Sequence, residues 1–365
     1  MPARVIFRNV DLGLIVAVLG LVAISLVALY SIAAGTNDDG GFTKQLIWIG
    51  IGLAAMTVTA FIDYTRLRHL TLVIYVLNIT LLLAIVFAGM TALGAQRWIM
   101  IGPFRFQPSE FTKLFVIMTL AAFLAERKGQ PIGWRDVSLV LAYAAPSIVL
   151  ILLQPDLGTA LVVCAIIAGM LLAAGAGYKQ LGALVFLSWV AGWVVIRFNL
   201  LHEYQLKRLA VFLNPDIDPL GSGYNLKQSI IAIGSGGVFG KGWLSGTQSR
   251  LDFLPPGVRH TDFIFAVIGE ELGLIGGIVL LALFFFLVSR TLRVAQLSRN
   301  YYGLLIGVGA VSMWIFQVLV NVGMTIGIMP ITGIPLPFVS YGGSSMLMNF
   351  MAVGMLLSVY ARRWR

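Results

Sequence analysis

Residues 12–34 read LGLIVAVLGLVAISLVALYSIAA, a stretch without a single charged side chain. A helix needs roughly 20 mostly apolar residues to cross the hydrocarbon core of a bilayer, and this stretch is long enough. It is longer than the apolar core of a signal peptide, about 7–15 residues, and no convincing cleavage site follows it. We therefore predict a retained first membrane span.

Similar apolar stretches recur along the chain and bring the predicted number of membrane spans to about ten. We place the later spans near residues 45–62, 70–93, 109–125, 137–154, 157–176, 180–199, 262–289, 303–328 and 339–360. Of the 365 residues, 59% are hydrophobic and only 11% are charged, with a mean hydropathy of +0.93. Soluble domains carry about 25% charged residues. The sequence predicts an all-α polytopic membrane protein with residues 1–365 in one domain.

The formal net charge is +10. In a soluble protein this surplus would suggest a nucleic-acid partner, but in a membrane protein Lys and Arg concentrate in cytoplasmic loops. Placing both termini in the cytoplasm gathers several basic pairs on that side: Arg127 and Lys128, Arg290 and Arg293, and Arg362 and Arg363. We expect cytoplasmic termini and no nucleic-acid partner. The lone cysteine, Cys164, rules out an internal disulfide or a multi-cysteine metal site.

One long segment outside the spans, residues about 200–261, separates the seventh and eighth spans. Its stretches 202–213 and 224–234 place apolar residues at helical spacing, and loops of this length usually have a function. We predict a large structured extracytoplasmic loop.

Charged residues near the outer ends of the spans are candidates for substrate binding. Glu110 and Lys113 lie one helical turn apart, either as a structural ion pair or with Lys113 facing an anion in an outward cavity. Further cations on the predicted outer side are suited to a phosphate or pyrophosphate. They are Arg97, Arg105, Lys207, Arg208 and Lys241.

Three carboxylates are also candidates. Asp262 stands where the long loop meets the eighth span, as a fixed external carboxylate or as a helix cap. On a continuous helix Glu270 is displaced from Asp262 by about 80° and Glu271 by about 180°, so Glu270 is the better cavity partner. Asp156 follows Pro155 at a predicted hairpin tip, where a turn or cap is the alternative.

The last spans contain polar residues as well. Gln317 and Asn321 share one face of the ninth span, where helix–helix hydrogen bonding is the default interpretation. Residues 333–345, GIPLPFVSYGGSS, indicate a broken helix lining a cavity, in which Ser340 could donate a hydrogen bond. No clustered His or Cys spacing predicts a zinc site.

Several strings together resemble the SEDS family (shape, elongation, division and sporulation), and within it the RodA branch. They are RWI with FRFQPSE, then QPDLGT, AIGSGGVFGKGWLSGTQS, HTDFIFAVIGEELG and PLPFVSYGGSS, in the family's order along nearly the whole chain. One departure is FLPPGVRHTDF, where the family usually has FLPE shortly before HTDF. This departure removes an acid and adds the cation Arg259.

The resemblance implies a peptidoglycan glycosyltransferase in the bacterial cytoplasmic membrane. Such an enzyme polymerises lipid II on the outer face during elongation and releases undecaprenyl pyrophosphate. The resemblance also implies a class B penicillin-binding protein and the elongation machinery as partners, and a divalent cation, Mg²⁺ or Mn²⁺. The family's essential aspartate aligns with Asp262.

The chemistry of that reaction assigns expected roles to the candidate residues. Asp262 is the expected general base, with metal ligation as the alternative. Glu110 is expected to orient Lys113, with Asp156 and Glu270 as weaker candidates. The expected pyrophosphate contacts are Arg97, Lys113, Arg208 and Lys241. A flippase for the lipid-linked precursor, or a non-catalytic scaffold for the penicillin-binding protein, remains the alternative function.

Overall fold

The computed structural model describes residues 10–35, 40–92, 95–102, 104–198, 203–251 and 253–364. Ten long helices dominate this part of the chain, and their bounds follow the predicted spans closely. They are α2 (Leu12–Gly35), α3 (Gly40–Phe61), α5 (Thr71–Ala88), α6 (Pro108–Ala125), α7 (Trp134–Leu153), α8 (Leu157–Ala173), α9 (Tyr178–Arg197), α14 (Ile264–Gln296), α15 (Tyr301–Thr325) and α16 (Gly343–Ala361). A short helix, α4 (Tyr64–His69), joins α3 to α5.

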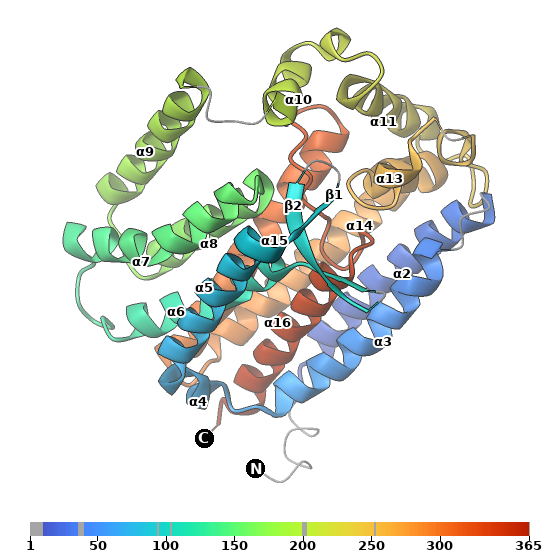
Figure 1. Ribbon diagram of the computed structural model, residues 1–365. Coiled ribbons are helices and arrows are strands. Elements are labelled where there is room, and N and C mark those ends of the chain that lie inside the picture. Colours follow the sequence, from blue (N-terminus) through green and yellow to red (C-terminus); the bar gives the residue numbers. More distant parts are fainter. Residues whose placement is uncertain are drawn as a thin grey trace.

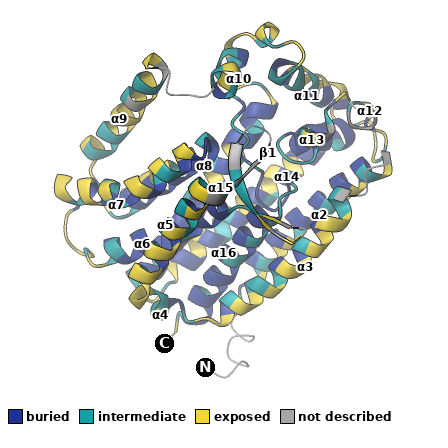
Figure 2. Ribbon diagram, in the orientation of Figure 1, coloured by how far each residue is buried: buried dark blue, intermediate teal, exposed yellow. Residues whose placement is uncertain are grey.

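Eight of these helices are long and apolar enough to cross a membrane, and two shorter apolar helices, Thr71–Phe87 and Leu157–Ala173, accompany them. The predicted all-α membrane fold is therefore confirmed. Most side chains of α6 are buried, and α5, α8, α15 and α16 pack around it. Helix α9 leans away from the bundle (Figure 1), and its side chains are mostly exposed (Figure 2).

A small antiparallel sheet was not predicted. It consists of β1 (Met90–Ala92), β2 (Ala95–Ile101) and β3 (Phe104–Phe106), in the order β1-β2-β3. The predicted span 70–93 is therefore too long, because α5 ends at Ala88. The sheet leads directly into α6, whose first residue is Pro108. Pro suits this first position because its missing N–H needs no partner there.

The predicted outer loop is helical. Its elements are α10 (Glu203–Leu213), the 3-10 helix η1 (Pro215–Ile217), α11 (Ser222–Gly236), α12 (Thr247–Arg250) and α13 (Pro256–Arg259). They cover the end of the bundle opposite the last described residues of the chain (Figure 1). At that other end Asp11 pairs with Arg290 at 2.6 Å and Asp63 pairs with Arg362 at 3.5 Å, which ties the ends of several helices together.

Helix α14 is broken at Gly273, whose φ of 64° is left-handed. Residues 236–250, which we call the strap, lie against this break. Leu274 N–H, which a continuous helix would bond to Glu270, donates instead to Gly237 O at 2.9 Å. In exchange, Glu270 O accepts from Lys241 N at 3.0 Å and Glu271 O accepts from Gly242 N at 3.1 Å. The strap thus satisfies backbone groups that the break would leave unbonded.

Gly273 is required at this break for two reasons. Its left-handed φ is costly for any residue with a side chain. A Cβ atom at this position would also collide with the backbone of Gly240 in the strap. The break therefore depends on two glycines in contact, one from each segment. Irregular backbone of this kind occurs in membrane proteins where protein groups re-satisfy its hydrogen bonds.

Candidate functional site

The elements from α10 to α13, residues 203–259, form what we call the outer cap. A cavity of about 880 Å³ opens beneath it. Its walls come from the sheet, from α3, α6, α8, α10, α13, α15 and the start of α16, and from the segments that follow α13 and precede α16. Six of the nine residues with an expected role in the site line it: Arg97, Glu110, Lys113, Asp156, Arg208 and Asp262. Arg105, a further candidate cation, lines it as well. Residues that are distant in sequence therefore meet in one site.

The backbone around Asp262 is held by three successive carbonyl groups. His260 O accepts from the Tyr341 N–H at 2.8 Å, and Thr261 O accepts from Ser340 Oγ at 2.6 Å. Asp262 O accepts from Asn321 Nδ2 at 3.1 Å. Helix α15 and the irregular segment before α16 therefore fix the position of Asp262.

The carboxylate of Asp262 lies beside Arg208. A Cβ atom built on Gly333 would lie 3.5 Å from Asp262 Oδ2 and 3.2 Å from Arg208 Nη1, so all three residues meet at one point. Burial raises the pKa of Asp262, and the positive charges of Arg208 and Arg97 lower it in part. Helix α14 starts at Ile264 with Phe263 at the N-cap position and no side-chain cap, which does not support the capping alternative for Asp262.

Asp156 caps helix α8, which is one of the alternatives that the sequence analysis considered. Its carboxylate accepts from Thr159 N at 3.2 Å and from Ser109 Oγ at 3.1 Å. Arg97 Nη1 lies 3.8 Å from the same carboxylate. Arg97 also donates to Pro155 O and, at 2.8 Å, to Tyr204 Oη. Asp156 and Arg97 therefore connect the sheet, the α7–α8 turn and the outer cap.

Glu110 and Lys113 form an ion pair in the wall of the cavity. Lys113 Nζ lies 2.8 Å from Glu110 Oε2, and the two side chains are only 1% and 5% exposed. The structural ion pair considered from the sequence therefore exists, and it also borders the cavity. In this pairing the two charges neutralise each other.

Three predicted site residues do not line the cavity. Glu270 faces the strap, where it accepts from Lys241 Nζ at 2.7 Å and from Thr247 N at 2.8 Å. Ser340 lies behind the Asp262 backbone, accepting from Leu336 N at 2.9 Å and donating to Thr261 O. The expectation that Lys241, Glu270 and Ser340 face the cavity was wrong.

Other lining residues were not predicted as site residues. Gln317 was assigned to helix packing and Gly333 was noted only as part of a broken helix, but both line the cavity with His260 and Tyr341. The run of Gly and Pro at 333–345 was the one sequence signal near them. Arg259, the extra cation of the departure, is buried in α13 and does not line the cavity.

The side chains that line the cavity do not form a complete metal site from protein ligands alone. Within the described residues, no three His, Cys, Asp or Glu side chains converge closely enough to hold an ion. Of the carboxylates that line the cavity, Glu110 is paired with Lys113 and Asp156 caps α8. These contacts leave Asp262 as the lining carboxylate that neither caps a helix nor pairs with a lysine, and Mg²⁺ at such a site takes most of its ligands from water and substrate phosphates.

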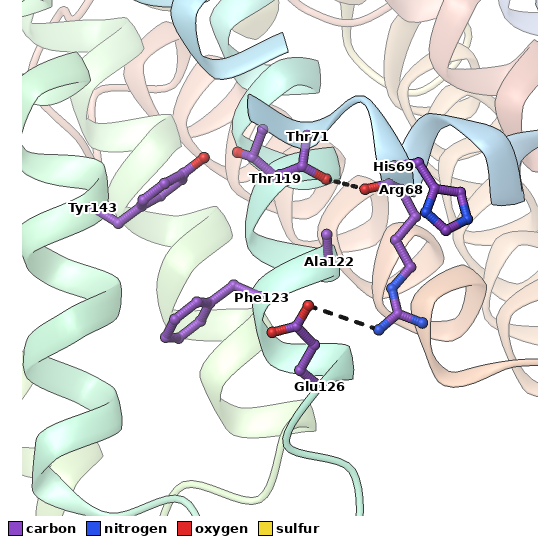
Figure 3. Close-up of a pocket in the computed structure, with 8 residues that line it drawn as sticks. All are labelled: Arg68, His69, Thr71, Thr119, Ala122, Phe123, Glu126 and Tyr143. Atoms are coloured by element: carbon purple, nitrogen blue, oxygen red, sulfur yellow. Dashed lines mark hydrogen bonds and ion pairs between the residues drawn. The ribbon is translucent and has the colours of Figure 1, made fainter. Parts of the chain in front are cut away.

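A second cavity of about 460 Å³ lies at the other end of the bundle, between α4, α5, α6 and α7 (Figure 3). Arg68 and Glu126 face each other there at 3.9 Å, with both side chains well exposed. None of the predicted site residues lines this cavity. The predicted site residues that line a cavity therefore all line the larger one, beneath the outer cap.

Apolar helices around a charged cavity with a fixed aspartate define a polytopic membrane protein with a polar site at one membrane boundary. The family of FtsW, RodA and SpoVE, described as cell cycle proteins, matches residues 9–364. The chain belongs to this family.

Curated relatives and solved structures match the chain over nearly its whole length. The chain is 38% identical to the peptidoglycan glycosyltransferase MrdB of Escherichia coli K12, over 97% of this chain and 94% of that protein. It is 34% identical to the peptidoglycan glycosyltransferase RodA of Treponema pallidum, over 97% and 98%. A structure of a peptidoglycan synthase complex matches with a TM-score of 0.83 and 32% identity over 98% of this chain and 99% of that one. The rod shape determining protein RodA of Thermus thermophilus matches with a TM-score of 0.73 and 31% identity over 98% of both chains.

Proposed function

We propose that this protein is a peptidoglycan glycosyltransferase that polymerises lipid II on the outer face of the bacterial cytoplasmic membrane. The observation that carries the proposal is the partly buried Asp262 beside Arg208 in a cavity at the capped end of the bundle. Relatives named for this activity match nearly the full chain, which supports the same assignment.

The residues suit the chemistry of glycosyl transfer. A hydroxyl oxygen of the acceptor sugar attacks the anomeric carbon of the donor, and the bond from that carbon to the phosphate oxygen breaks. The Asp262 carboxylate accepts the hydroxyl proton as general base. Undecaprenyl pyrophosphate leaves with the electron pair, and cations that line the cavity, Arg97 and Arg208, are placed to stabilise its charge.

The orientation and the partners belong to the same proposal. Arg290 and Arg362 lie at the end of the bundle away from the cap, and the preference of Lys and Arg for the cytoplasmic side supports cytoplasmic termini with the cap outside. A class B penicillin-binding protein is the proposed partner, and a match to a peptidoglycan synthase complex supports it.

A divalent cation, Mg²⁺ or Mn²⁺, remains a prediction from the family resemblance. The described residues around Asp262 do not form a protein site for it, so we assign it no step. If the cation enters with the substrate's pyrophosphate, a chelator will leave the Tm of the purified protein unchanged.

Reconstitution with labelled lipid II tests the proposed function. The protein would be placed in liposomes with and without the penicillin-binding protein, and with Mg²⁺ or chelator. Glycan chains resolved by electrophoresis are the expected result. Movement of lipid II across the bilayer without polymer would instead indicate a flippase. Polymer that appears only from the partner would indicate a scaffold.

A further inference from the structure

We infer that Gln317 contacts the substrate and binds neighbouring polar substituents of a sugar ring; this inference rests on the proposed function. Gln317 lies on α15 and borders the inner part of the cavity together with Lys113 of α6 and Val162 of α8. These three helices pack against one another. The residue therefore belongs to the floor of the cavity, away from the cap.

The amide of Gln317 is buried without hydrogen bonds. The side chain is 0% exposed, and within the described part of the chain neither Nε2 nor Oε1 has a hydrogen-bond partner. Buried polar groups in proteins are nearly always bonded, and a side chain with both ends unbonded calls for an explanation. A residue that costs stability but borders the site is typical of a binding function.

Neighbouring polar residues of α15 are used differently. Asn321, one turn along, donates to Asp262 O at 3.1 Å and to Ile334 O at 2.8 Å. Trp314 donates from Nε1 to Asn349 Oδ1 at 2.7 Å. Both hold the protein's own segments together. The helix–helix hydrogen bonds that the sequence suggested for Gln317 and Asn321 are therefore not seen within the described residues, because Asn321 bonds to two segments outside the helices.

The chemistry of a carboxamide selects the group that it binds. Its C=O accepts and its NH₂ donates side by side, whereas a pyrophosphate offers acceptors alone and would leave Oε1 unbonded beside a negative charge. Adjacent hydroxyl or acetamido substituents on a sugar ring offer both a donor and an acceptor. Gln317 therefore fits a neutral carbohydrate edge.

The distribution of charge in the cavity agrees with a neutral sugar at the floor, next to Gln317. At the floor, the Lys113 ammonium is already bonded to Glu110 at 2.8 Å. Nearer the cap, Arg208 of α10 and Arg97 of β2 supply positive charge. The sugar then lies toward the floor and the pyrophosphate toward the cap. Because Gln317 is fully covered, its side chain must rotate about its own bonds to reach the sugar.

The test compares Gln317→Met, which keeps the length of the side chain, with Gln130→Met at an exposed position of a turn far from the cavity. Three quantities are measured: the Tm, the KM for lipid II, and the inhibition constant of undecaprenyl pyrophosphate. We expect Gln317→Met to keep or raise the Tm, because it removes an unbonded buried amide. We expect its KM to rise roughly three- to tenfold, the loss of about one hydrogen bond. Undecaprenyl pyrophosphate carries no sugar, so its inhibition constant should be the same in Gln317→Met as in Gln130→Met.

Three results would overturn the inference. A Tm that falls, or a variant that does not fold, would make Gln317 a structural residue. An unchanged KM would remove it from the binding site, and a parallel rise in KM and inhibition constant would assign it to the pyrophosphate. Wild-type protein that binds lipid II without polymerising it would contradict the proposed function alone, because the dissociation constant of lipid II then replaces KM in the comparison.

Discussion

Asn321 donates its side-chain amide to the main-chain carbonyl of Asp262 at 3.1 Å. The residue is fully buried, and its second hydrogen bond, to Ile334 O at 2.8 Å, reaches the segment that precedes α16. One side chain therefore joins the stretch of backbone that carries Asp262 to the irregular segment beside it. The position of the proposed base depends on contacts between parts of the chain that are far apart in sequence.

Ser340 makes the neighbouring contact, and its loss should displace Asp262. Ser340→Ala removes the bond to Thr261 O and leaves Leu336 N without its partner. We expect a loss of about 1–3 kcal/mol in the free energy of unfolding. We also expect kcat to fall roughly ten- to a hundredfold with little change in KM, because a small displacement of the base is costly. Ser138→Ala, at an exposed position of α7, is the control. Normal kcat in a destabilised Ser340→Ala protein would show that Ser340 does not position the base.

Gly333 lies against both Asp262 and Arg208, and a methyl group there should disturb both. Its φ is +73°, and a Cβ atom would lie 3.2 Å from Arg208 Nη1. Gly129→Ala is the matched control, since Gly129 has a φ of +80° in a turn where a Cβ atom meets nothing within 4 Å. Both variants should lose roughly similar stability, about 1 kcal/mol or more. Only Gly333→Ala should lose polymerisation. Equal activities in the two variants would contradict the arrangement.

The strap is held to the broken helix by Glu270. This side chain is fully buried and accepts hydrogen bonds from Lys241, Thr247 and Gln248. Glu270→Ala removes the acceptor of these hydrogen bonds and leaves Lys241, whose side chain is 27% exposed, with only its bond to Thr247 Oγ1. We expect a cost of about 1–3 kcal/mol, because the backbone N–H groups of Thr247 and Gln248 lose their acceptor. We expect a lower Tm and faster amide hydrogen exchange across residues 236–250.

The exposed pair of Lys227 and Asp216 provides the control for Glu270. Asp216→Ala should cost less than about 1 kcal/mol, as usual for surface ion pairs. If both variants lost the same stability, the strap would not depend on Glu270.

The pH dependence of the reaction should follow the ionisation of Asp262. A base must be deprotonated, so the rate should rise with pH through the pKa of Asp262, which burial raises. Arg208 lowers that pKa, and Arg208→Gln should therefore move the acid side of the profile to higher pH. Lys207→Gln removes the same charge from an exposed position of the same helix. It should leave the profile in place. A profile that Arg208→Gln does not move would show that the titrating group is not Asp262.

The membrane helices could be predicted because long apolar runs report directly on burial in lipid. The sheet at residues 90–106 could not, because its strands are short and apolar and merge with the preceding span. Arg97, Glu110, Lys113, Asp156, Arg208 and Asp262 were all expected near one cavity and line it. They could be predicted because ionisable residues next to long apolar stretches are costly and usually mark a functional site.

Glu270 and Ser340 show where sequence reasoning fails. The angle between Asp262 and Glu270 assumed one continuous helix, but α14 begins only at Ile264, so Asp262 lies outside it. Helical phase therefore could not be carried from one carboxylate to the other. Ser340 is turned by an irregular segment toward Thr261, a contact between residues far apart in sequence that periodicity does not contain.

Asp262→Asn tests the central claim most directly. The purified variant would be compared with wild type for lipid II polymerisation, lipid II affinity and Tm. Asn keeps the shape of the side chain and resembles the neutral form that burial favours, so the Tm should be unchanged or higher. Affinity should change little, while polymerisation should fall at least about a hundredfold, as expected for loss of a general base. Polymerisation at the wild-type rate by a folded Asp262→Asn protein would contradict the account.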